Sequence, residues 1–289
     1  MNVSTLRKPA AALPLQQGGA SEPLVAVRRG ENTGQREWSR KAQRWLRIIS
    51  PFILLALWEA ASRLGMLDAR FFPPPSEIIF AARDGILNGS LISATVTSLR
   101  RLALGYAVGA AGGVVVGLWL GLSPWFRAAV EPWLQLTYPV PKLTLFPLLV
   151  LLVGFGETPI VILLAIAVFY IVAINTTAGV LSIRPVILDV GRDCGASFFQ
   201  SFRTIALPAA LPHIFTSLEI ALGIGFIVLV AVEFIGAKTG LGAIIWSSWQ
   251  TFDVAPMYVA IFMVSLCGYA SALLLKSAGS LMMPWRKTN

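Results

Sequence analysis

The sequence predicts an all-α polytopic membrane protein with about six transmembrane helices. Apolar residues make up 56% of the 289 positions, and charged residues make up only 13%. The mean hydropathy is +0.74. The apolar residues also gather into runs about as long as the hydrocarbon core of a bilayer is thick. A chain with this composition and patterning crosses a membrane several times.

The net charge of +9 does not by itself indicate a nucleic-acid partner. Most basic residues lie near the amino terminus or in short loops beside apolar runs, and membrane topology explains that pattern, so we expect no nucleic acid. The single histidine, His213, excludes a multi-histidine metal site. Cys194 and Cys267 are far apart, so neither a disulfide framework nor a metal cluster is expected.

Three compositional zones follow one another along the chain. Residues 1–45 are rich in Gln, Gly, Ser, Pro, Ala and Arg and show no periodicity, which predicts a disordered basic cytoplasmic tail. Residues 46–285 are expected to form the transmembrane domain. Residues 286–289 are expected to form a short cytoplasmic tail.

The hydropathy pattern predicts six spans, and the basic residues predict their orientation. The spans are expected at 46–64, 102–122, 133–153, 160–181, 214–235 and 254–275. The amino-terminal tail and the connections on its side hold far more Lys and Arg than the connections on the other side, where Arg70, Arg83 and Lys238 lie. The positive-inside rule therefore predicts that both termini are cytoplasmic.

The first outer connection and the second span each carry a local pattern. Three prolines at 73–75 are followed by Ser76, which we expect to be the N-cap of a short surface helix. Ile78, Ile79, Ala82 and Ile86 would form its apolar face. The second span places a glycine at every fourth position from 105 to 121, a stripe that allows another helix to approach closely.

Ionisable and polar residues inside the spans are candidates for a solute pathway, because such groups are costly to bury in a membrane. Lys142 lies in a proline-broken third span and is the best single candidate for attracting an anion. Glu59 and Arg63 are four residues apart and are expected to pair structurally. The predicted pathway residues are Lys142, Asn175, Thr176, Glu219 and Glu233.

The cytoplasmic insert at 182–212 is polar and separates two long apolar runs. Its charged residues, Gly195 and the apolar side chains that follow predict two short helices that turn at the glycine. Pro208 and Pro212 are expected to end the second of these helices before the fifth span begins. A docking surface is one interpretation, and an ordinary polar hairpin is the other.

This insert resembles the EAA loop of bacterial ATP-binding-cassette (ABC) importer permeases. The pattern of that loop is Glu-Ala-Ala, three residues, Gly, nine residues, Ile, one residue and Leu-Pro. Asp189, Val190 and Gly191 stand at its opening positions, where only Asp189 is conservative, and Gly195, Ile205, Leu207 and Pro208 match. The resemblance implies that these residues, with Ala196 and Ser197, couple the chain to an ATPase through helices at about 185–208.

Further segments resemble the nitrate, sulfonate and taurine subfamily of these permeases. They are Phe-Pro-Pro-Pro-Ser at 72–76, Ser-Leu-Arg-Arg at 98–101, Pro-Val-Pro-Lys at 139–142, and Glu233 before Gly-Leu-Gly at 240–242. The resemblance covers roughly residues 46–285. It implies a MetI-like type I ABC importer permease fold in the bacterial inner membrane.

The resemblance also implies the partners. These are two copies of a separate ABC ATPase, a periplasmic or lipoprotein substrate-binding protein, a second copy of this chain and membrane lipid. The sequence has no phosphate loop of the Gly-x-x-x-x-Gly-Lys-Ser/Thr type, so ATP and Mg²⁺ are expected to bind the partner, and no cofactor to bind this chain.

The cargo and two other classes of function stay open. Similar permeases carry nitrate, taurine, aliphatic sulfonates, aromatic acids or pyrimidine precursors of thiamine, and a small anion is the preferred expectation. An ATP-independent channel or secondary transporter is an alternative. A membrane enzyme is the third, and it lacks any catalytic cluster of carboxylates, Ser-His-Asp or histidines in the sequence.

Overall fold

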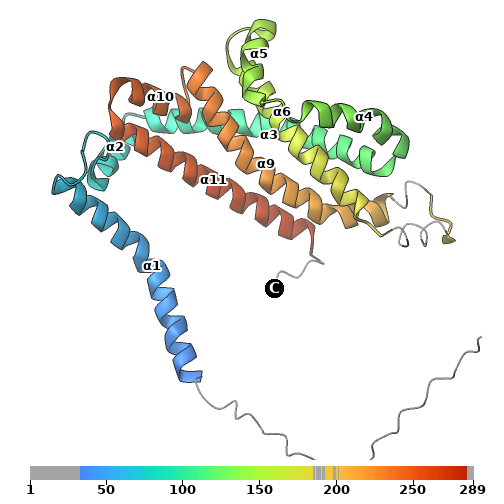
Figure 1. Ribbon diagram of the computed structural model, residues 1–289, viewed down its shortest axis with the longest axis horizontal. Helices are drawn as coiled ribbons and strands as arrows, with labels where there is room; N and C mark the ends of the chain where they lie inside the picture. The colour runs from blue at the N-terminus through green and yellow to red at the C-terminus, as the bar shows by residue number, and fades with distance from the viewer. Residues whose placement is uncertain are drawn as a thin grey trace, which may run out of the picture. The chain divides into compact units, whose positions relative to one another are not determined.

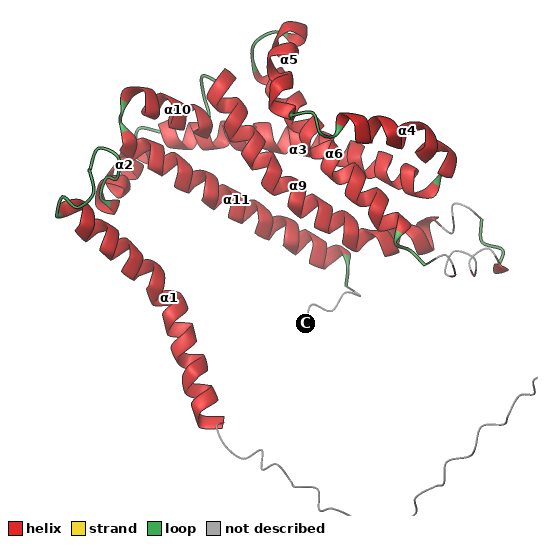
Figure 2. Cartoon of the chain, viewed as in Figure 1, coloured by secondary structure: helices red, strands yellow, loops and turns green. Residues whose placement is uncertain are grey.

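The computed structural model describes residues 33–184, 186, 190, 193–197, 200 and 202–284, and at 33–41, 44 and 202 it describes the backbone only. The described residues form helices and connecting turns without a β-strand (Figure 1 and Figure 2). The chain divides into two compact units, Met1–Phe52 and Ile53–Asn289. The predicted terminal tails lie mostly outside the described residues and stay predictions.

The helices are, in chain order, α1 (Thr33–Arg63), α2 (Pro75–Leu87), α3 (Ser90–Leu122), α4 (Pro124–Thr137), η1 (Lys142–Leu145), α5 (Phe146–Val153), α6 (Glu157–Leu181), η2 (Phe202–Ala206), α9 (Leu207–Gly236), α10 (Leu241–Thr251) and α11 (Val254–Met282).

Five of these helices are long and apolar enough to cross a membrane. They are the Trp45–Arg63 part of α1, α3, α6, the Arg203–Gly236 stretch that contains α9, and α11. The predicted third span is not one helix, because α4 and the η1–α5 segment meet at a bend of 90°. Pro139 and Pro141 lie at this break, and neither can donate a backbone hydrogen bond to continue a helix. The prediction of about six spans holds if the bent pair counts as one.

Helices α3 and α6 pack closely along the predicted glycine stripe. A Cβ added at Gly113 would lie 2.8 Å from Val172 Cβ, and one added at Gly117 would lie 2.6 Å from the carbonyl oxygen of Ala173. Real Cβ atoms do not approach other atoms so closely. The stripe therefore lets two backbones meet, which confirms its predicted packing role.

One helix boundary differs from the predictions, and one helix was not predicted. Helix α3 begins at Ser90, well before the predicted start at residue 102, so Arg100 and Arg101 lie within the helix and not in the outer connection. Helix α10 was not predicted at all, because its 11 residues are too few to give a span-like apolar run. Its start follows Gly240, which has a φ of +121°.

The start of α2 also differs from the prediction. Its N-cap residue is Pro74, and Ser76 lies in the first turn, where its amide and hydroxyl donate to Glu59 of α1 at 3.0 and 2.9 Å. The Glu59 carboxylate thus satisfies a free amide at the helix start. Arg63 pairs with the same carboxylate, as predicted.

The predicted apolar face of α2 is only partly correct. Ile78 is buried against α3, α10 and α11, whereas Ile79 and Ile86 are 67% and 48% exposed in the isolated chain. The helix therefore rests on the neighbouring spans through one side that is centred on Ile78.

The π-helix η2 runs directly into α9. Pro208 is the second residue of α9 and Pro212 lies inside it, so neither residue separates the insert from the fifth span as predicted. Proline is tolerated in the first turn of a helix, where its missing N–H would have no partner. The insert and the span are consequently one continuous helical segment from Phe202 onward.

The largest core of the second unit lies between α3, α6 and α9. Leu163, Leu164, Leu229 and Val232 are at most 1% exposed there. Smaller apolar clusters continue this core toward α2, α10 and α11 and toward the first turns of α9. Figure 1 shows α3, α6, α9 and α11 side by side in this unit.

Candidate functional site

The connection between α6 and α9 contains the predicted coupling segment, and its described part is open to the surroundings. Gly195 and Ser197 are exposed, Ala196 is half-buried, and Val190 is 56% exposed. Asp189 and Gly191 lie outside the described residues.

The backbone of this segment turns at Gly195, as the sequence predicts. Gly195 has a φ of +74°, and a Cβ added there would meet no atom within 4 Å. The amide of Ser197 donates to Gln200 Oε1 at 2.9 Å, and the amide of Gln200 donates to Ser197 Oγ at 3.3 Å. This reciprocal pair is a capping box, which marks the start of a helix.

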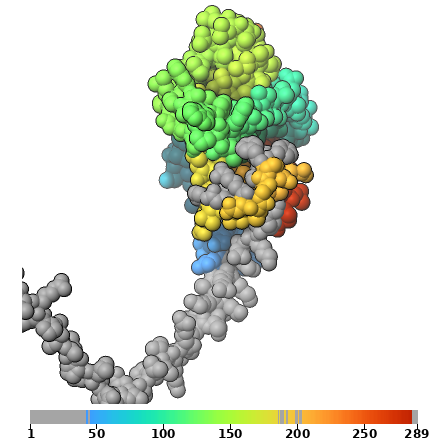
Figure 3. Space-filling model, turned by 90° about the vertical axis from the view of Figure 1, so that its right-hand side faces the viewer, coloured from blue at the N-terminus to red at the C-terminus, as the bar shows by residue number. Residues whose placement is uncertain are grey.

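The remaining coupling residues anchor the segment to the spans. Ile205, Leu207 and Pro208 are half-buried at the junction of η2 and α9. Leu207 packs on an apolar cluster that contains Val180 of α6. Figure 3 shows the start of α9 beside the end of α6 on one face of the unit. A force applied to the segment would therefore reach both helices.

The five predicted pathway residues do not come together in one site. Asn175 Nδ2 donates to the carbonyl of Ile171 within α6 at 2.8 Å. Thr176 is fully buried against α3. Lys142, Glu219 and Glu233 lie in three different surroundings. Their pathway role stays a prediction.

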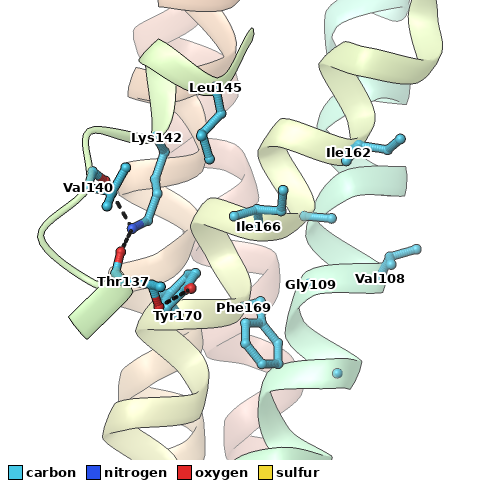
Figure 4. A pocket seen from close by; sticks show the side chains of 12 residues that line it. Val108, Gly109, Thr137, Val140, Lys142, Leu145, Ile162, Ile166, Phe169 and Tyr170 are labelled. Carbon is cyan, nitrogen blue, oxygen red and sulfur yellow. Dashed lines mark hydrogen bonds between the residues drawn. The ribbon is translucent and has the colours of Figure 1, made fainter. Parts of the chain in front are cut away.

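Lys142 lies at the break between α4 and η1, beside a cavity of about 710 Å³ (Figure 4). Its ammonium donates to the carbonyls of Thr137, Tyr138 and Val140 at 2.9, 2.8 and 3.0 Å. It also lies 4.2 Å from the centre of the Tyr170 ring. An ammonium has three donors, and all three are used here. These contacts cap the carboxyl end of α4, where a positive charge is favourable.

Replacing Lys142 with methionine is expected to lower the free energy of unfolding by about 1 kcal/mol, because the last carbonyls of α4 lose their cationic cap. Thermal unfolding of the purified chain in detergent measures the change. Lys238→Met is the control, since Lys238 is exposed in a loop and its loss should cost less than about 0.5 kcal/mol. Equal melting temperatures for the two variants would contradict the capping role.

A buried ionic network lies where α3, α6, α9 and the loop before α10 meet. Arg101 is 2% exposed, and its guanidinium donates to both oxygens of Glu157 at 2.6 and 2.7 Å. It also donates to Glu233 Oε1 at 2.7 Å and to the carbonyl of Thr239. One side chain therefore ties four elements together, with the fork geometry that suits an arginine.

Glu233 is the second centre of this network and is fully buried. Its carboxylate accepts from Ser98 Oγ at 2.8 Å and from the amide of Gly242 at 2.8 Å. The hydroxyl of Ser98 in turn accepts from the amide of Leu241 at 2.8 Å. Free amides at the start of α10 are thereby satisfied. Glu233 thus faces this network in the isolated chain.

Sequence reasoning identified Glu233 but gave Arg101 no role. The signal was present, because an arginine inside an apolar helix needs a charged partner. The partners are 56 and 132 positions away, and neither separation is visible in the sequence pattern.

The family described as "Binding-protein-dependent transport system inner membrane component" matches residues 113–278. A curated relative is the "Taurine transport system permease protein TauC" of Escherichia coli (strain K12). It is 32% identical over 253 residues, which are 86% of this chain and 92% of that protein. Another is the "Putative aliphatic sulfonates transport permease protein SsuC" of Bacillus subtilis (strain 168), 29% identical over 86% of this chain and 91% of that protein.

A solved structure also shares the fold. An inward-facing form of the MetNI methionine ABC transporter matches with a TM-score of 0.58 at 18% identity. The match covers 68% of this chain and 96% of that chain. The predicted all-α, MetI-like architecture is confirmed by this likeness.

Proposed function

Because this chain belongs to the family of binding-protein-dependent transport system inner membrane components, we propose that it is the membrane-spanning subunit of an ATP-driven importer whose cargo is a small sulfonate such as taurine. Membership in the family supports the translocation role. The relatives named for taurine and aliphatic sulfonates support the cargo class.

In the proposed mechanism, ATP bound by a partner subunit supplies the energy for transport. Two ATPase subunits grip the segment around Gly195 on two copies of this chain, and ATP closes them on each other. That movement is passed to the spans, because η2 and α9 are continuous. A soluble binding protein delivers the cargo from the outer side, and both termini lie in the cytoplasm.

The exposed turn at Gly195 is the observation that carries this proposal. It combines a left-handed backbone, open space above the Cα atom and half-buried anchors at Ile205 and Leu207. A partner can therefore press directly against the glycine backbone, and the anchors transmit its displacement. The glycine conformation alone is shared with other surface turns such as the one at Gly65, and the half-buried anchors at Ile205 and Leu207 distinguish this segment.

Replacing Gly195 with tryptophan is the test of the docking role. The indole would fill the space that the ATPase is proposed to occupy, so co-purification with the cognate ATPase subunit should fall by about tenfold or more, which corresponds to at least about 1.4 kcal/mol of binding free energy. ATP-dependent uptake in proteoliposomes should fall in parallel.

Gly65→Trp is the matched control. Gly65 has a φ of +72°, and a Cβ there would also meet nothing within 4 Å, so the backbone strain is the same. It lies in the connection between α1 and α2, which is predicted to be on the opposite side of the membrane. If both variants retain the ATPase equally, or if the chain alone accumulates cargo without ATP, the proposal fails.

A further inference from the structure

A second, smaller cavity of about 230 Å³ lies between α9 and α11. The two helices approach closely at its edge, since a Cβ added at Gly279 would lie 2.9 Å from Phe215 Cδ1. Its volume corresponds to roughly seven or eight water molecules, which is enough for a small solute. The lining residues are Phe215, Thr216, Glu219, Lys276, Gly279, Ser280 and Met283.

Two opposite charges line this cavity from opposite helices. Glu219 belongs to α9 and Lys276 to α11. Among the described residues, neither side chain forms an ion pair within 4.0 Å or a hydrogen bond. By contrast, Glu59 and Glu233 each have an arginine partner. Both side chains are exposed in the isolated chain, so each can contact a charged group of opposite sign that enters the cavity.

The cavity lies in the first half of α9 and near the carboxyl end of α11. Glu219 is about 18 Å along α9 from Leu207, and Lys276 is about 9 Å from the end of α11 at Met282, at 1.5 Å per residue. These ends are predicted to be cytoplasmic. A solute bound there would be near the exit of an import pathway.

We propose that this cavity binds a small zwitterion whose ammonium contacts Glu219 and whose acid group contacts Lys276. This inference rests on the proposed function and names the class of cargo within it. The hydroxyl of Thr216 donates to the carbonyl of Pro212, so its oxygen remains able to accept from the ammonium. A simple anion would meet the Lys276 charge but also the like charge of Glu219. The site therefore favours an amino-sulfonate over an anion without an amine.

The same chemistry occurs in two sources, a transported amino-sulfonate and the headgroup of phosphatidylethanolamine. We assign the site to the transported solute. If α9 and α11 line the cytoplasmic end of the import pathway, each transported molecule passes this cavity. The lipid is an outcome that the experiment separates.

The test uses the purified complex of this chain with its ATPase, in nanodiscs of phosphatidylcholine alone. Taurine and isethionate serve as probes, because isethionate carries a hydroxyl in place of the ammonium. Equilibrium binding should favour taurine by about tenfold, the ratio expected for one charge-assisted hydrogen bond. Glu219→Gln should remove this preference by lowering the affinity for taurine alone. Lys276→Met should lower the affinity for both probes. Lys238→Met should change neither.

The proposal is overturned if wild-type complex binds both probes equally or neither, or if Glu219→Gln weakens both to the same degree. It is also overturned if phosphatidylethanolamine co-purifies with wild type and is lost from Glu219→Gln without any taurine binding. In each case, ATP-dependent uptake of a sulfonate by the complete transporter would leave the proposed function standing.

Discussion

Replacing Arg101 with alanine is expected to lower the free energy of unfolding by about 3–5 kcal/mol, because Glu233 would remain buried without its charged partner. Arg101 also holds Glu157 and the carbonyl of Thr239, so one substitution disconnects three neighbours. The loop before α10 should loosen first. The effect is large enough to reduce the amount of folded protein in the membrane.

Arg100→Ala is the matched control for this prediction. Arg100 is the preceding residue, its side chain is 62% exposed, and its only ion pair is a longer one of 3.4 Å to Glu157 among the described residues. An exposed pair of this kind is worth at most about 1 kcal/mol. If the two variants lose the same stability, the network is not the support that its geometry indicates.

The chain offers its own reporter of unfolding for these measurements. Cys267 of α11 is buried and Cys194 is exposed. In a Cys194→Ser background, a thiol-reactive fluorophore will label Cys267 only when the spans separate. The midpoint of labelling against temperature then gives the stability of each variant in detergent.

Replacing Gly113 with alanine is expected to lower the free energy of unfolding by about 1–3 kcal/mol, the usual cost of overpacking a close contact. The new methyl group would lie 2.8 Å from Val172 Cβ and 2.9 Å from the carbonyl oxygen of Phe169. A backbone carbonyl cannot move aside cheaply, so α3 and α6 would have to separate. The same labelling assay measures the change.

Gly112→Ala controls for the change in helix propensity. It lies next to Gly113 in α3, but its Cβ would be 3.4 Å from the flexible end of the Phe169 ring. Alanine is the better helix former by about 1 kcal/mol, so this variant should be neutral or more stable than wild type. A loss in Gly112→Ala as large as that in Gly113→Ala would contradict the close-packing account.

Local patterns predicted the features that depend on local chemistry. Hydropathy located the spans, glycines four apart predicted the face of α3 that meets α6, and Gly195 predicted a turn. The early start of α3 was missed, because a hydropathy scale places a charged residue such as Arg101 outside the membrane. In the structure its charge is neutralised by residues that come together only on folding.

Features that depend on two distant segments could not be read from either one. A free amide in the first turn of α2 donates to Glu59 of another helix, so the prediction of Ser76 as a local N-cap was wrong. The start of α10 is satisfied by Glu233 and Ser98 in the same way. The cavity between α9 and α11 was equally hidden, since Glu219 and Lys276 belong to different spans.

Helix α9 joins the two regions that matter most in this molecule. It begins at Leu207, directly after η2, and its 30 residues extend for about 45 Å, with the buried carboxylate of Glu233 in the last turn. Arg101 contacts α9 at the end that carries Glu233. If α9 tilts as one body about that contact, a displacement at Leu207 would move Glu219 more than it moves Glu233.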